Sequence, residues 1–230
     1  MIVLCGGIKG GIGKTTVATN LTVIRANKLG AGKVVLIDSD PQESAYKFTQ
    51  LRNEVNGDAG YHCFKLTGKP VRSEGLGLSA KYQDVIIDAG VGDSFGQRAA
   101  MTIADVMVLP FRPSSYDIWT LASLVQLVDE MQDVNPKLRV IAFLNQADHV
   151  GHDNAEAAEM LKEATNVTLI DAALGYRKAF RNTAAGKSVT ELMPQDMKAT
   201  AEMLKLYRAI FDTRKMHPDV TKNHSERKAG

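Results

Sequence analysis

The stretch GGIKGGIGKTT, Gly6–Thr16, decides the fold of this 230-residue chain. It follows an apolar run at residues 2–5 and leads into an apolar pattern that predicts a helix from Lys14 to about Leu29. Glycines at a strand-to-helix junction let the backbone approach an anion, and their amide groups form a nest backed by the helix N-terminus. The stretch therefore predicts a phosphate-binding loop.

The end of this loop suits a nucleoside triphosphate with Mg²⁺. The backbone of Gly10–Gly13 would surround the phosphates, and Lys14 would neutralise the β- and γ-phosphates. Thr15 would offer its hydroxyl to Mg²⁺, and Thr16 could donate to the α-phosphate. The common pattern G-x4-G-K-[ST] requires glycine where this chain has Ile8, so the loop is a variant of that pattern.

Strand-like apolar runs alternate with helical patterns along the chain. Strands are expected at residues 2–5, 33–38, 61–66, 84–88, 105–110, 139–145 and 167–171, with Pro110 ending the fifth. Helices are expected at residues 14–29, from Pro41 onward, and at 117–131, 154–163, 176–185 and 196–211. The alternation predicts an α/β fold, a mostly parallel twisted sheet with helices on both faces. We expect one domain over residues 1–212 and a disordered basic tail over residues 213–230.

Aspartates follow two of the expected strands. Asp38 and Asp40 lie at the end of the strand at residues 33–38, and Asp88 ends the strand at residues 84–88. The carboxyl ends of parallel strands meet at one edge of a sheet, so these side chains are expected beside the phosphate loop. A carboxylate there can hold Mg²⁺ or position an attacking water. Asp40 is also placed to cap the helix that follows it.

These motifs together resemble a known family. Residues Lys9–Thr16 match K-G-G-x-G-K-[ST]-[ST], the deviant Walker A motif of the ParA/MinD family of P-loop ATPases. Asp38–Gln42 matches the family's D-x-D-P-Q motif, and Asp88 matches its Walker B aspartate. The resemblance covers about residues 1–211 and is strongest to short ParA-type partition ATPases that lack an N-terminal helix-turn-helix. It implies an ATPase with Mg²⁺ as cofactor, slow intrinsic turnover and stimulation by a partner protein.

The resemblance also assigns roles to residues. In this family the early lysine, Lys9 here, reaches across the interface of an ATP-bound homodimer to the partner's phosphates. Catalytic roles are implied for Lys9, Lys14 and Asp40, with Asp40 positioning or activating the attacking water. Mg²⁺ would be held by Thr15, Asp38 and Asp88. The implied nucleotide contacts are Lys9, Gly10, Gly11, Ile12, Gly13, Lys14, Thr15, Thr16 and, at the adenine, Asn145.

A local basic cluster suggests a partner for the dimer. Residues 175–192 resemble a late segment of ParA proteins and carry Arg177, Lys178, Arg181 and Lys187. In ParA proteins, basic residues of this region bind DNA without sequence preference, because phosphate contacts need only charge and reach. The resemblance thus implies a nucleoid-associated switch that segregates plasmid or chromosomal DNA with a ParB-like partner. A solvated helix face is the alternative for the cluster.

Composition limits the other classes of protein. The net charge is +2 and the last 18 residues alone contribute +3, so overall basicity is no argument for nucleic-acid binding. Cys5 and Cys63 have no metal-ligand spacing, which argues against a zinc site or a disulfide framework. Reduced thiols without a signal peptide suggest the cytoplasm. No apolar run approaches the ~20 residues of a membrane span.

Other classes of protein use the same kind of phosphate loop, and most of them fit the remaining sequence features less well. A MinD-like membrane switch would need a C-terminal amphipathic basic helix, whereas residues 203–211 resemble a packed final helix. An electron-transfer ATPase would need a cluster-ligating cysteine after Asp88, and the sequence has none there. Lys9 and the D-x-D-P-Q motif argue against a small-molecule kinase or ligase. A ParA-like ATPase that positions another cargo, such as conjugation machinery or another protein complex, stays open.

Overall fold

The computed structural model describes residues 1–212 apart from 93, 114–117, 148–152 and 163. These residues form a seven-stranded sheet in the order β3-β2-β4-β1-β5-β6-β7, in which all neighbouring strands are parallel. The strands are β1 (Ile2–Cys5), β2 (Val34–Ser39), β3 (His62–Lys65), β4 (Asp84–Ala89), β5 (Val106–Phe111), β6 (Arg139–Ala147) and β7 (Thr168–Gly175). The predicted parallel sheet is confirmed.

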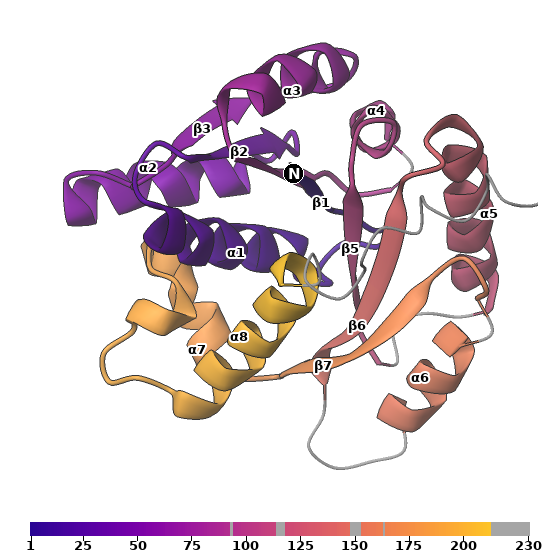
Figure 1. Ribbon diagram of the computed structural model, residues 1–230. Coiled ribbons are helices and arrows are strands. Elements are labelled where there is room, and N and C mark those ends of the chain that lie inside the picture. The colour runs from indigo at the N-terminus through magenta and orange to yellow at the C-terminus, as the bar shows by residue number, and fades with distance from the viewer. Residues whose placement is uncertain (93, 114–117, 148–152, 163, 213–230) are drawn as a thin grey trace, which may run out of the picture.

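Helices cover both faces of the sheet, as predicted (Figure 1). One face carries α1 (Lys14–Leu29), α2 (Ser44–Asn56), α7 (Lys178–Asn182) and α8 (Met197–Phe211), with the short 3₁₀ helices η1 (Thr183–Ala185) and η2 (Val189–Glu191). The other face carries α3 (Pro70–Lys81), α4 (Phe95–Met101), α5 (Ile118–Val134) and α6 (Asp153–Lys162). Strand side chains alternate between the two cores, which explains why the strands read as continuous apolar runs.

The topology brings the motifs to one edge. Strand β1 lies between β4 and β5, and Cys5 at its end is opposite Asp88 of β4. Asp38 of β2 is opposite Asp88 on the other side of β4. The loop that leaves β1, Gly6–Gly13, therefore lies at the same end of the sheet as both aspartates. In open α/β sheets this carboxyl edge is where ligands bind.

Two predictions about prolines are wrong. Strand β5 runs past Pro110, which is opposite Phe143 of β6. The pairing of β5 with β1 ends at Val108, so the missing N–H of Pro110 removes no hydrogen bond from that ladder. Pro41 does not lie in the first turn of α2, because a turn closed by Glu43 N and Asp40 O (2.9 Å) precedes the helix.

Other boundaries differ from the predictions. Helices α3 and α4 were not expected, and the helix expected at residues 176–185 is the shorter α7 followed by η1. Strand β7 extends to Gly175, four residues beyond its expected end. The tail predicted to be disordered, residues 213–230, lies outside the described residues. In the part of the chain that the structure describes, we find no helix with the length and hydrophobicity of a membrane span.

Candidate nucleotide-binding site

The phosphate loop has the backbone that its glycines suggest, with one exception. Gly11 and Gly13 have φ angles of +72° and +90°, in the left-handed region that favours glycine. Gly10 does not, and an added Cβ there would lie in ordinary contact with Val91, 3.5 Å away. The backbone angles at Gly10 therefore do not require glycine. Gly13 also precedes α1 directly, so the loop passes straight into the helix N-terminus.

Two amide side chains at the end of β6 hold the loop in place. The Nδ2 atom of Asn145 donates to the carbonyl oxygen of Ile12 at 2.6 Å, and Nε2 of Gln146 donates to that of Gly11 at 2.9 Å. A side chain on Gly13 would collide with the Asn145 amide. Gln146 itself has a φ of +55°, uncommon for a residue with a side chain. The adenine contact of Asn145 stays a prediction, and Gln146 was missed because only the fold brings it to Gly11.

Lys14 is held inside the loop. Its ammonium nitrogen donates to the carbonyl oxygen of Lys9 at 3.0 Å, and the residue is 6% exposed. Burial lowers the pKa of Lys14, although the nearby charges of Asp88 and Asp40 act to raise it. Lys9 is partly exposed, and its role across a dimer interface stays a prediction. A cation drawn toward two carboxylates at the helix N-terminus is placed to bind an anion of high charge.

Asp38 and Asp40 shape the turn between β2 and α2. The two oxygens of Asp38 accept hydrogen bonds from the backbone amides of Asp40 (3.0 Å) and Tyr46 (2.7 Å). Burial raises the pKa of Asp38, and these backbone hydrogen bonds act to lower it. Asp40 accepts from the amide of Gln42 at 2.9 Å. The capping expected of Asp40 is therefore performed by Asp38, because Tyr46 lies in the first turn of α2.

Asp88 is the most unusual group of the site. It is fully buried, and neither carboxylate oxygen has a hydrogen-bond partner among the described residues. Burial raises the pKa of Asp88 to about 8, even though the neighbouring Thr15 hydroxyl and Lys14 ammonium act to lower it. With this pKa, Asp88 is mostly a protonated carboxylic acid at neutral pH in the free protein, and a bound cation would favour its ionised form. The pair Thr15 and Asp88 therefore fits Mg²⁺, which prefers oxygen ligands.

No cluster of three or more His, Cys, Asp or Glu side chains that could hold a metal occurs among the described residues. Mg²⁺ beside a nucleotide is typically held by one or two protein oxygens, substrate phosphates and water rather than by an all-protein cage. Asp38 shares its oxygens with two backbone amides, so direct ligation would compete with those hydrogen bonds. Its predicted place near the metal is untested.

A cavity of about 90 Å³ opens beside the loop, next to Thr16. Its wall is largely apolar and is made by residues of β6, β7 and α7. The aromatic side chains in it are Tyr176 and Phe180, and no motif in the sequence predicts them at this site. An aromatic wall next to a phosphate loop suits a nucleobase, which offers a flat apolar face.

The predicted basic cluster is divided by the structure. Arg177 lines the cavity and forms a two-pronged ion pair with Glu202 of α8, with N–O distances of 2.6 Å and 2.9 Å. Lys178 and Arg181 are exposed, and Lys187 is partly exposed. Arg181 also donates to the Tyr176 hydroxyl at 3.2 Å. Arg177 and Arg181 both line the cavity, whereas Lys178 and Lys187 reach the surface outside its lining.

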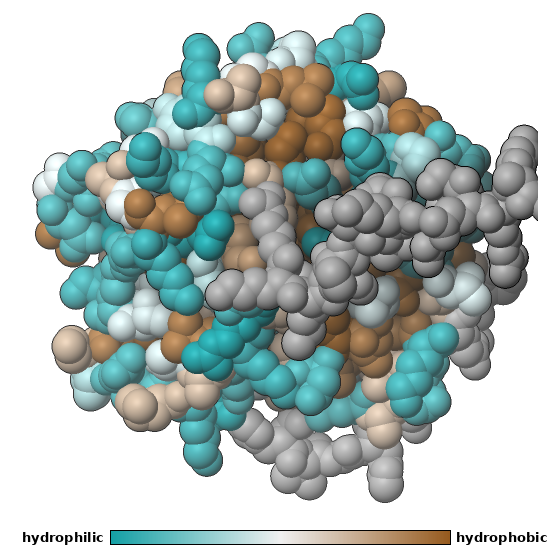
Figure 2. All heavy atoms as spheres, viewed as in Figure 1, coloured by the Kyte–Doolittle hydropathy of each residue, from teal (hydrophilic) through white to brown (hydrophobic). Residues whose placement is uncertain are grey.

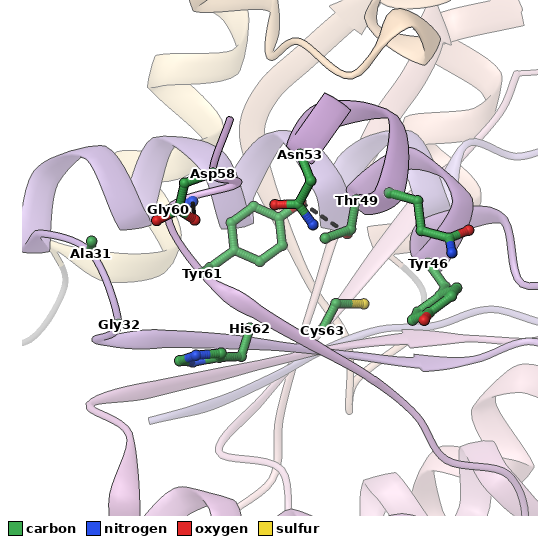
Figure 3. Close-up of a pocket in the computed structure, with 11 residues that line it drawn as sticks. Ala31, Gly32, Tyr46, Thr49, Asn53, Asp58, Gly60, Tyr61, His62 and Cys63 are labelled. Atoms are coloured by element: carbon green, nitrogen blue, oxygen red, sulfur yellow. Dashed lines mark hydrogen bonds between the residues drawn. The ribbon is translucent and has the colours of Figure 1, made fainter. Parts of the chain in front are cut away.

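A second cavity, of about 290 Å³, lies between α2 and the edge strand β3 (Figure 3). The hydroxyls of Thr49 and Tyr61 lie 3.0 Å apart in its wall. The thiol of Cys63 also lines it, and burial raises the pKa of this thiol to about 12, so it is protonated at neutral pH. Its lining includes none of the motif residues. We therefore assign the candidate site to the carboxyl edge of the sheet.

Comparison with known proteins agrees with this geometry. The model of the CobQ/CobB/MinD/ParA nucleotide binding domain matches residues 2–190. The maintenance of carboxysome distribution protein A of Halothiobacillus neapolitanus is 24% identical over 207 residues, covering 89% of this chain and 93% of that protein. The chromosome-partitioning ATPase Soj of Thermus thermophilus is 28% identical over 163 residues, covering 59% of this chain and 65% of Soj.

Among solved structures, the cell division ATPase MinD of Pyrococcus furiosus has a similar fold. Its TM-score is 0.70, at 20% sequence identity, and the match covers 94% of this chain and 99% of that one. At this identity the likeness concerns the fold alone. It supports the sheet and its helices, and the match of the family model covers the loop and the aspartates of the site.

Proposed function

Because this chain belongs to the CobQ/CobB/MinD/ParA family of nucleotide-binding P-loop proteins, we propose that it is an ATP-driven dimerising switch that positions DNA or another cargo. The observation that carries the proposal is Asp88, a buried carboxylate without a partner beside Lys14 and the phosphate loop. A group so placed is costly in the free protein and becomes compensated when a nucleotide arrives with its cation.

ATP would bind along the loop Gly10–Thr16, with its base toward the cavity at Tyr176 and Phe180. Lys14 would exchange the carbonyl of Lys9 for the phosphates, since a charge-assisted bond to an anion is stronger than one to a neutral carbonyl. Thr15 and Asp88 would hold Mg²⁺, which supplies charge neutralisation at the phosphates when bound. Asp40 would position the attacking water. The loop and carboxylates offer no strong base, so slow intrinsic turnover is expected.

Dimerisation would join two copies through this edge. Lys9 would reach the partner's phosphates, which makes closure depend on the charge of ATP. Hydrophobic residues gather around α3 and α4 on the face in Figure 2. Val91, which an added Cβ on Gly10 would touch, is an exposed hydrophobic side chain beside the loop, and Phe95 at the start of α4 is 83% exposed. Apolar surface beside a charged loop is what a switchable interface needs.

The closed dimer would bind DNA without sequence preference. Lys178, Arg181 and Lys187 are the candidate contacts, because exposed cations on one surface can neutralise several phosphates. Arg177 is better placed to support the cavity through Glu202. A ParB-like partner would stimulate hydrolysis and release the DNA. For a protein with this activity we expect localisation in the bacterial cytoplasm, on the nucleoid in the ATP-bound state.

The cargo could be a protein assembly rather than DNA, and one relative favours this alternative. The Halothiobacillus relative maintains carboxysome distribution, so a protein assembly as cargo is a specific competitor to a plasmid or chromosome. A MinD-like membrane role is less favoured. The apolar face of α8, including Met203, Leu206 and Tyr207, is buried in the core and therefore is not offered to a lipid surface.

The test is retention of nonspecific DNA by the purified protein with ATPγS, ADP or no nucleotide, beside anionic liposomes. We expect DNA retention with ATPγS alone, falling steeply as salt rises, and no liposome binding. Lys178→Ala/Lys187→Ala, which leaves the lining of the cavity intact, should weaken retention and flatten its salt dependence without a change in ATP affinity. Retention that ignores the nucleotide would contradict the switch, and liposome binding would favour the membrane alternative.

A further inference from the structure

The side chain of Gln97 joins two segments of the site that are far apart in sequence. Gln97 lies in α4 and is completely buried. Its Oε1 atom accepts a hydrogen bond from the backbone amide of Gly7 at 2.9 Å. Its Nε2 atom donates to the carbonyl oxygen of Gly92 at 3.2 Å. One amide group thus bridges the start of the phosphate loop and the segment that follows Asp88.

Both segments that Gln97 bridges contain glycines, whose backbones are flexible, so contacts from elsewhere are needed to hold them in one conformation. Gly7 has a φ of 154° and begins the loop, and Gly92 has a φ of +81°, four residues after the unsatisfied carboxylate of Asp88. Glycine backbones are the least constrained by local sterics, so outside contacts must hold them. Gln97 supplies such a contact to each, from a helix whose position is set elsewhere.

The helix that carries Gln97, α4, is held in place by its contact with the end of β2, next to Asp38. Gly96 packs so closely on β2 that an added Cβ would come within 2.5 Å of the Ser39 hydroxyl. The Ser94 hydroxyl accepts from the backbone amide of Gln97 at 3.2 Å and caps the helix. The first turn of α4 therefore contacts all three segments that carry the motifs, and the side chain of Gln97 bonds two of them.

The chemistry at this position requires an amide. The Gly7 amide needs an acceptor and the Gly92 carbonyl needs a donor, and glutamine offers both at the ends of one flat group. Methionine would fill the same space and satisfy neither partner. A buried backbone group left without its partner carries the full penalty of its desolvation, which exceeds the net value of an ordinary hydrogen bond.

We propose that Gln97 is a positioning residue that couples the segment after Asp88 to the phosphate loop, so that each responds to a γ-phosphate bound by the other. The inference rests on the proposed function, since it concerns the triphosphate state of the same site. A shift of Gly92 toward or away from a bound γ-phosphate changes the direction of the Gln97 amide, and this moves its bond to Gly7. Segments held by one rigid bridge move together.

The test compares ATPγS with ADP, each with Mg²⁺, in Gln97→Met and in Gln97→Glu. The second variant keeps the length and the acceptor toward Gly7, but in its ionised form it cannot donate to Gly92, so it is measured at a pH high enough to ionise a buried carboxyl. The matched control is Asn135→Leu. The Asn135 amide holds the other end of α4 through the carbonyls of Met101 and Ala104, both at 2.9 Å, away from the loop. Binding is measured by titration, and backbone hydrogen exchange is followed in peptides covering residues 2–16 and 89–101.

In the wild type we expect ATPγS to protect both peptides more than ADP does. In both Gln97 variants the protection of residues 89–101 by ATPγS should be lost while that of residues 2–16 remains, and the preference for ATPγS over ADP should fall about five- to tenfold. Asn135→Leu should lower the melting temperature and keep both effects. Coupling retained in both Gln97 variants, or lost equally in Asn135→Leu, would overturn the inference. A wild type that binds neither nucleotide would instead overturn the proposed function.

Discussion

Asp84 and Asp88 lie at opposite ends of the same strand, β4, and both are buried. Asp84 accepts a hydrogen bond of 2.7 Å from Nε of Arg25, whose NH1 donates in turn to the Tyr207 hydroxyl at 2.8 Å. The other oxygen of Asp84 lies 3.2 Å from the backbone amine of Met1. Asp88 has no such partners among the described residues. Asp84 stabilises the fold through its ion pairs, whereas Asp88 is available to a ligand.

The largest expected difference comes from the same change at the two ends of β4. Asp84→Asn should lower the free energy of unfolding of the nucleotide-free protein by about 3 kcal/mol, because it leaves Arg25 without its buried counter-charge. Asp88→Asn should raise it by about 1 kcal/mol, because a carboxyl whose ionisation is disfavoured by burial is replaced by a neutral amide. Urea denaturation of both variants measures this. Destabilisation of the same size at both positions would contradict the contrast.

At the ligand-facing end, Lys14→Ala should weaken ATP binding by more than about thirtyfold, or about 2 kcal/mol, through loss of a charge-assisted contact to the phosphates. Its matched control is Lys9→Ala, five residues earlier in the same loop. Lys9→Ala should keep the affinity for ATP within about twofold and lose ATP-dependent dimerisation. Calorimetric titration and light scattering separate the two outcomes. If Lys9→Ala still dimerises with ATP, Lys9 does not act across the interface.

Some parts of the fold and of the site could be predicted from local sequence patterns, and others could not. The phosphate loop between a strand and a helix, and the alternation of strands and helices that gives a parallel sheet, follow from local patterns, and both were predicted. Helices α3 and α4 were not predicted, because their glycines read as loop. The structure shows Gly75 and Gly96 placed where a Cβ would press on Ile103 and Ser39, so they are there for close packing.

The unpredicted parts of the site have a similar cause. Gln97 and Gln146 lie 90 and 135 residues from the loop carbonyls and amides that they contact, and no spacing rule links them. The role of Arg177 likewise depended on a partner, Glu202, which only the packing of α8 brings near. Local motifs name the residues that meet a ligand, while long-range contacts decide which side chains hold them in place.

On the scaffold side, Gly186→Ala should destabilise the protein by about 2 kcal/mol. Gly186 has a φ of +77°, and a Cβ there would lie 2.9 Å from the backbone nitrogen of Arg52 in α2. The matched control is Gly57→Ala, which has the same backbone angle, +78°, and open space around it. The control should cost about 1 kcal/mol, the backbone term alone. Equal losses of stability in the two variants would show that the contact with α2 is unimportant.

The smallest expected effect concerns Glu191, which Arg52 binds through two nitrogens at 2.7 Å and 2.9 Å. Burial acts to raise the pKa of Glu191, but hydrogen bonds from Arg52, the Ser188 amide and Asn27 outweigh it, so this pKa lies below its ordinary value of 4.5. A carboxyl whose pKa is lower in the folded than in the unfolded protein stabilises the fold above the unfolded-state pKa.

That stabilisation disappears as the pH falls through the folded-state pKa. Glu191→Gln should therefore be less stable than the wild type by about 1 kcal/mol at neutral pH, and the gap should close as the pH falls below 4.5. Urea denaturation of the nucleotide-free proteins across this range measures the gap. If the difference in free energy of unfolding stays constant with pH, ionisation of Glu191 does not stabilise the fold, and its contact with Arg52 contributes through packing and neutral hydrogen bonds alone.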